Sequence, residues 1–188
     1  MMKRILNYAL KMFGLHFGGM VAALFLVPVY GAMWSNNAIF QWAMTVCIIA
    51  ILAILLWIPS ADIGVKDYMH DELLDKNLKT DEPRWFHPAK GLLGGLISQV
   101  PALVLLLVCV LLPESGFAKM LVQGWYYMFK KLMDTWPNLW ALICLGGGLF
   151  SMAVCALGYL QGREMRLRTK IIIARNDAKR ARKKPNNR

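Results

Sequence analysis

The sequence predicts an all-α integral membrane protein in which four helices cross the bilayer and both termini are cytoplasmic. Hydrophobic residues make up 57% of the 188-residue chain and charged residues only 18%, whereas soluble domains contain about 45–50% apolar residues. Four uncharged apolar segments also reach the roughly 20 residues that a helix needs to cross a bilayer. Together these observations exclude an ordinary soluble enzyme, a disordered chain and a small disulfide-bonded secreted domain.

The four segments contain no Asp, Glu, Lys or Arg, and none alternates with the two-residue period of a half-buried strand. The predicted spans are residues 12–34, 39–58, 91–112 and 139–160. Because only a short polar link separates the first two spans, we expect a tight antiparallel hairpin. The predicted membrane domain is therefore 1–162, with a cytoplasmic loop at 59–90, an outer loop at 113–138 and a basic tail at 163–188.

The distribution of positive charge predicts the orientation. Nineteen of the 22 Lys and Arg residues fall on the side that holds both termini and the 59–90 loop, and three fall in the 113–138 loop. Since Lys and Arg gather on the cytoplasmic side of membrane proteins, both ends are expected in the cytoplasm. The basic N-terminus also suits a cleaved signal peptide, but the first apolar run is too long for one, which favours an uncleaved span. This bias, with the compact loops, suits the plasma membrane of a bacterium.

Glycine pairs at four-residue spacing predict close helix contacts, because such pairs share one face of a helix. The pairs are Gly14 and Gly18, Gly91 and Gly95, and Gly158 and Gly162. The spacing does not distinguish contacts within one chain from contacts between chains. Four helices can satisfy one another, so contacts within one chain are the default interpretation.

Polar side chains are scarce within the predicted spans. His16 is the one histidine there, and Gln41, Ser98 and Gln99 add neutral polar groups. Transporters coupled to ions use ionisable groups inside the membrane. Because the predicted spans contain no carboxylate that could act with His16, a structural role for this histidine is the favoured interpretation. The alternative is a path for a small neutral or lipid-like solute, lined by these four side chains in an oligomer.

The 59–90 loop predicts a short amphipathic helix over residues 65–79, lying on the inner membrane surface. Asp67, His70 and Asp71 share one face of this helix. They are the only catalytic candidates, since together they could hold a divalent metal for chemistry on phospholipid or isoprenoid phosphate. The loop lacks an established metal-ligand motif, so a solvated charged face is the favoured interpretation, and we expect no metal and no cofactor.

The outer loop predicts one amphipathic helix over residues 117–136, resting in the outer membrane interface. Its apolar face consists of Leu121, Trp125, Met128, Phe129, Leu132 and Trp136. A docking surface or lid over the bundle is one interpretation of this helix. A simple connector that rests on the membrane is the favoured one.

The basic tail is expected to begin as a continuation of the fourth helix and then to contact anionic lipids. Each basic residue near such a surface contributes about 1 kcal/mol, and the candidates are Lys179, Arg180, Arg182, Lys183 and Lys184. Phosphates of a nucleic acid would attract the same charges. No aromatic residue interrupts the basic run, however, so base stacking has no support and nucleic acid is not the expected partner.

These observations favour a non-catalytic accessory, scaffold or regulatory subunit of a membrane complex. Such a protein would have a protein partner in the membrane or would form a homo-oligomer. The first alternative is the oligomeric solute transporter, and the second is the membrane enzyme that uses the cytoplasmic loop.

Overall fold

The computed structural model describes residues 2–33, 37–76, 83–112 and 114–183, which are mostly helical and contain no strand. Four helices are long and apolar enough to cross a membrane: α1 (Met2–Met33), α2 (Ala38–Lys76), α3 (Ala89–Leu111) and α6 (Trp140–Lys183). The predictions of an all-α chain and of four potential spans are therefore confirmed, and the chain has the build of a multi-pass membrane protein.

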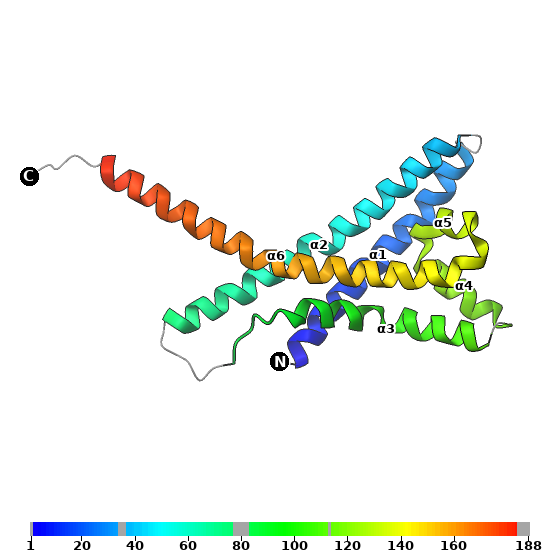
Figure 1. Cartoon of the computed structure of the whole chain (residues 1–188), viewed down its shortest axis with the longest axis horizontal. Coiled ribbons are helices and arrows are strands. Elements are labelled where there is room, and N and C mark those ends of the chain that lie inside the picture. The colour runs from blue at the N-terminus through cyan, green and yellow to red at the C-terminus, as the bar shows by residue number, and fades with distance from the viewer. Residues whose placement is uncertain (1, 34–36, 77–82, 113, 184–188) are drawn as a thin grey trace, which may run out of the picture.

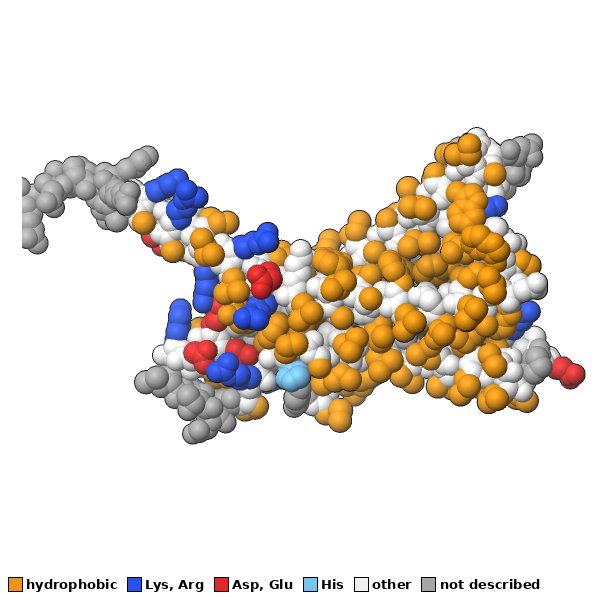
Figure 2. All heavy atoms as spheres, viewed as in Figure 1, with side chains coloured by type: hydrophobic (Ala, Val, Ile, Leu, Met, Phe, Trp, Pro, Cys, Tyr) orange, Lys and Arg blue, Asp and Glu red, His pale blue; other side chains and the backbone are white. Residues whose placement is uncertain are grey.

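The outer surface of the bundle is mainly apolar. Figure 2 shows hydrophobic side chains spread over most of the visible face, with Lys, Arg, Asp and Glu gathered toward one end. Phe25, Val46 and Leu142 are 72%, 62% and 64% exposed. Soluble monomers rarely leave such extended apolar surface uncovered, whereas a surface of this kind is compatible with lipid.

The four long helices run antiparallel in sequence order, so one end of the bundle holds the start of α1, the end of α2 and the start of α3 (Figure 1). The second half of α6 leaves the bundle at this same end. We call this end the charged end. The other end is covered by α4 (Gly116–Trp125), η1 (Tyr127–Phe129), α5 (Lys130–Thr135) and η2 (Pro137–Leu139), which together form the cap.

The predicted surface helix at 65–79 is not a separate element. Residues 65–76 are helical, but they continue α2 without a break through Pro59, and residues 77–79 lie outside the described part of the chain. Asp67, Asp71 and Leu74 are buried within this extension. Asp67 has partners on α3 and α6, and Asp71 has partners in the segment before α3. These contacts stabilise the helix of α2 beyond the end of its apolar run.

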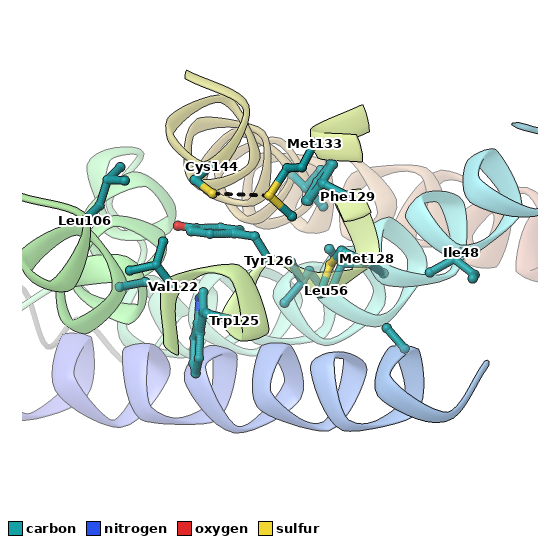
Figure 3. Close-up of a cluster of buried hydrophobic side chains, with 14 of the residues drawn as sticks. Ile48, Leu56, Leu106, Val122, Trp125, Tyr126, Met128, Phe129, Met133 and Cys144 are labelled. Carbon is teal, nitrogen blue, oxygen red and sulfur yellow. Dashed lines mark hydrogen bonds between the residues drawn. The ribbon is translucent and has the colours of Figure 1, made fainter. Parts of the chain in front are cut away.

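The predicted single helix over 117–136 is wrong, because the chain breaks after Trp125 and folds into the bundle. Ser115 caps α4 by accepting a hydrogen bond from the amide of Ala118. Val122 and Tyr126 have no exposed surface, and Figure 3 shows them among side chains of the neighbouring helices. Because of this break, large side chains point into the bundle. In one continuous helix the same side chains would lie along the membrane interface.

The predicted apolar face is correspondingly divided. Trp125, Met128 and Phe129 are buried and Leu132 is half-buried, whereas Leu121 and Trp136 are exposed.

Glycines allow α2 and α6 to cross with their backbones in contact. A Cβ atom at Gly158 would lie 2.8 Å from the carbonyl oxygen of Trp57, closer than real Cβ contacts come. Gly64 faces the backbone of Tyr159 in the same way, and Gly162 faces the backbone of Ala61. The crossing therefore depends on the absence of side chains at these three positions.

Of the other predicted pairs, Gly91 and Gly95 lie against α6, where added Cβ atoms would come within 3.1 Å of its atoms. Gly14 and Gly18 have no neighbour within 4 Å of such an atom. Among the described residues, this pair therefore makes no close helix contact.

Replacing Gly162 by Ala should force α2 and α6 apart and lower the free energy of unfolding by about 1–3 kcal/mol, the usual cost of overpacking. Thermal unfolding in detergent measures the effect. The matched control is Gly146→Ala on the same helix, where a Cβ meets nothing within 4 Å. Because alanine favours a helix over glycine, the control should be neutral or slightly stabilising. Equal effects at the two positions would contradict the backbone crossing.

Candidate functional site

The charged end contains a buried ion pair shared by three helices. Asp67 from α2, Lys90 from α3 and Tyr159 from α6 are 5%, 4% and 0% exposed. The Lys90 ammonium donates a hydrogen bond to Oδ2 of Asp67, and the Tyr159 hydroxyl donates to the same oxygen at 2.7 Å. We call these three residues the clasp.

The clasp holds α2, α3 and α6 together. Removing two charges from water is costly, and the cost is offset only when the partners are close and further hydrogen bonds satisfy them. Asp67 meets both conditions, because it accepts from a cation and from a phenol. The ring of Tyr159 also occupies the space left by Gly91, where a Cβ would come within 2.7 Å of the tyrosine.

A second carboxylate holds the segment that enters α3. Asp71 accepts hydrogen bonds from the backbone amides of Trp85, at 2.7 Å, and Phe86, at 3.0 Å. A carboxylate that accepts from backbone amides makes strong, charge-assisted bonds. Phe86 then stacks on Tyr159, with ring centroids 5.2 Å apart and planes 9° from parallel. The entry to α3 is thereby fastened to the clasp.

Trp85 lies between two side chains from different helices. The Arg4 guanidinium carbon is 3.3 Å from the centre of the indole, and the His70 ring is stacked 3.4 Å from it. Two groups cannot both approach the ring centre this closely on one face, so they occupy opposite faces. The start of α1 is thus attached to α2 through an aromatic ring, in a cation–π contact.

The three catalytic candidates therefore do not converge on one point. Asp67 binds Lys90 and Tyr159, Asp71 binds two amides, and His70 stacks on Trp85 with its Nδ1 atom 3.7 Å from Asp71. Within the described ranges, no three His, Cys, Asp or Glu side chains are arranged to hold a metal ion. The three residues are neighbours because they share one face of α2, but the side chain of each contacts a different partner.

A second buried polar cluster lies beneath the cap and is centred on Gln99. Its side-chain oxygen accepts hydrogen bonds from the Trp125 indole and the Tyr126 hydroxyl, both at 3.2 Å. Its side-chain nitrogen lies 3.3 Å from Nδ1 of His16. Because an amide nitrogen only donates, Nδ1 accepts and the proton of His16 sits on Nε2. The ring of His16 stacks on Trp125 at 4.8 Å.

Tyr126 acts as a donor in this cluster over the physiological pH range. Its removal from water raises the pKa of the hydroxyl above its usual value, and the nearby Cys144 thiol adds to the effect. His16, Gln99 and Tyr126 are each at most 2% exposed. The cluster thus ties α1 and α3 to the cap with its hydrogen bonds directed inward.

The four side chains predicted to line a solute path are not brought together. His16 and Gln99 meet, but Ser98 donates to the Gly95 carbonyl of its own helix at 2.7 Å. Gln41 accepts a hydrogen bond from Lys131 of the cap at 2.6 Å. Sequence reasoning missed Tyr126, Lys90 and Tyr159. A glutamine in an apolar span signals that donors must lie nearby, but it does not say which residues supply them.

The second half of α6 carries the remaining candidates. We call residues 163–183 the arm, and it is one helix with the span before it. Near its base Glu72 of α2 accepts a hydrogen bond from Arg166 at 3.3 Å and pairs with Lys170 at 2.5 Å. Lys179 is exposed. The side chains of Arg180, Arg182 and Lys183 and the whole of Lys184 lie outside the described part of the chain.

No protein-family model, curated protein or solved structure matches this chain.

Replacing Lys90 by Met should lower the free energy of unfolding by about 3–5 kcal/mol, because it leaves the Asp67 carboxylate buried without its cation. The double variant Lys90→Met/Asp67→Asn should recover most of this loss, since the amide is neutral and can still accept from Tyr159. Chemical unfolding in detergent measures both.

The control is Lys66→Met, which removes an ion pair with Asp62 on the surface. The side chains of Lys66 and Asp62 are 69% and 47% exposed. Surface pairs contribute about 0–1 kcal/mol, so this change should be nearly silent. A loss no larger at Lys90 than at Lys66 would contradict the clasp.

Proposed function

We propose that this protein is a non-catalytic accessory subunit of a membrane complex and that the arm of α6 binds its partner. The observation that carries the proposal is the exposure of Ile171, Ile172 and Ile173, which are 68%, 58% and 51% exposed on a helix outside the bundle. Three consecutive isoleucines in water are unfavourable, at roughly 25 cal/mol for each Å² of apolar surface. A partner that covers them would recover this free energy.

The arm also has the pattern of a helix that packs on another helix. Leu167, Ile171, Ala174 and Ala178 recur at spacings of four and three residues, the repeat by which helices pack side by side. Nine Lys and Arg residues and two acidic residues fall in the arm. An amphipathic helix with acidic residues beside its apolar stripe is the complementary partner.

The connection of the arm to the bundle supports a regulatory or scaffolding role. The arm continues α6 directly, so it has no flexible joint with the span. Glu72 pairs with Arg166 and Lys170 and so fixes the base of the arm against α2. A force on the arm would therefore be transmitted to the α2–α6 crossing through the continuous helix and through these two ion pairs.

The polar interior supports a structural role more than transport or catalysis. The side chains of the clasp and of the Gln99 cluster bind one another across helices, and they are almost completely buried. Buried polar networks of this kind rigidify a fold and specify one arrangement of its helices. The orientation proposed for the arm is cytoplasmic, because the charged end carries most of the basic residues.

Replacing Ile171, Ile172 and Ile173 together by Ser should release the partner. The full-length protein is extracted from native membranes in mild detergent, and co-purifying proteins are quantified by mass spectrometry. We expect one stoichiometric partner, retained at least about tenfold less by the triple Ser variant, equivalent to about 1.4 kcal/mol.

The matched control is the triple Leu variant, which keeps the apolar surface and the helix and should retain the partner. Purification of the wild-type chain alone or only as a homo-oligomer would overturn the proposal. Equal retention by the Ser and Leu variants would overturn the role of the arm.

A further inference from the structure

A groove opens at the charged end of the bundle, beside the crossing of α2 and α6. It lies between α2, α6 and the segment before α3, and its volume is about 410 Å³. Trp57, Phe86, Leu157 and Leu160 supply its apolar wall. Specific ligand sites have volumes of roughly 300–1,000 Å³, so the groove can hold part of one lipid molecule.

The apolar wall has the chemistry that suits the acyl chains of a lipid. Leu157 and Leu160 are 55% and 40% exposed, and they belong to the apolar stretch of α6 that faces outward with the rest of the bundle surface. A groove in a bilayer-facing surface fills with acyl chains, because water gains few hydrogen bonds against such walls. Trp57 stands near the end of the apolar run of α2, and tryptophan is enriched where a span meets the headgroup region.

The rim of the same groove carries two opposite charges. Arg163 and Glu164 both line it, with Gln161 beside them. Within the described residues, neither Arg163 nor Glu164 forms a salt bridge. The Arg163 guanidinium lies 5.7 Å from the ring centre of Tyr68. The rim therefore offers one cation and one anion to a headgroup.

We propose that this groove binds one phospholipid with a zwitterionic ethanolamine headgroup. Arg163 binds the phosphate, Glu164 accepts hydrogen bonds from the primary ammonium, and the acyl chains lie along Leu157 and Leu160. A purely anionic headgroup places a like charge against Glu164. A choline headgroup has no N–H to donate to that carboxylate. The groove shares Arg163 and Glu164 with the base of the arm, but Ile171, Ile172 and Ile173 do not line it. The proposal therefore does not depend on the proposed function.

Lipid retention by the purified full-length protein tests the site. The delipidated protein is mixed in detergent with phosphatidylethanolamine, phosphatidylcholine or phosphatidylglycerol of equal chain composition, and bound lipid is counted by native mass spectrometry. We expect one molecule of phosphatidylethanolamine to be retained in preference to the other two. Preference for phosphatidylglycerol, equal retention of the ethanolamine and choline lipids, or no retained lipid would each overturn the proposal.

Two rim variants separate the zwitterionic from an anionic ligand. Arg163→Gln and Glu164→Gln should each weaken retention of the ethanolamine lipid about two- to fivefold, the range of an exposed ion pair. An increase in lipid retention for Glu164→Gln would overturn the role of this carboxylate. The matched controls are Arg168→Gln and Asp177→Asn, which remove the same charges from arm positions outside the groove and should leave retention unchanged.

A third pair of variants tests the apolar wall. Leu157→Trp fills the groove and should abolish retention, whereas Leu149→Trp lies outside it on the same helix. The two leucines are comparably exposed, at 55% and 53%, so the control reproduces any general effect of a large ring on the bilayer-facing surface. Unfolding temperatures of all variants should match that of the wild type. Retention that survives Leu157→Trp would contradict binding in this groove.

Discussion

The backbone crossing of α2 and α6 is the constraint on which the charged end depends. Gly64, Gly158 and Gly162 bring the two helices together without intervening side chains. The crossing places Tyr159 opposite Asp67, so its hydroxyl reaches the carboxylate that also binds Lys90. Beyond the crossing the two helices diverge (Figure 1), and α6 continues out of the bundle as the arm. Helix packing in a membrane relies on such small residues, because lipid supplies no hydrophobic force between helices.

Buried hydrogen bonds and an ion pair then fix the positions of the helices, which apolar packing alone does not specify. The clasp connects α2, α3 and α6 at the charged end, and Gln99 connects α1, α3 and the cap deeper in the bundle. Each cluster joins segments far apart in the sequence, and each is nearly closed to solvent. A buried charge that loses its partner costs several kcal/mol, so a helix arrangement that separates Asp67 from Lys90 is unfavourable. The resulting bundle is a rigid support for features that face outward, namely the arm and the groove.

The sequence predicts the helices better than their contacts. Hydropathy is a local property, so the four long helices follow from composition and run length. Glycine spacing identified Gly158 and Gly162 as a shared face, but the same rule selected Gly14 and Gly18, which lie against no other helix in the part of the chain that the structure describes. Asp71 looked like a metal ligand because its amide partners lie 14 and 15 residues away. The cap was misjudged for a similar reason, since periodicity does not reveal that Val122 and Tyr126 are buried among other helices.

The role proposed for the arm requires that α6 is one rigid unit from the span through the arm, held at its crossing with α2. Pulsed electron spin resonance in lipid nanodiscs measures this directly, with spin-labelled non-natural amino acids at the exposed positions Lys76 of α2 and Arg175 of α6. We expect a single narrow distribution of distances between the two labels. A broad or two-peaked distribution in the otherwise unaltered protein would show that the arm moves independently of the bundle, and it would contradict the account.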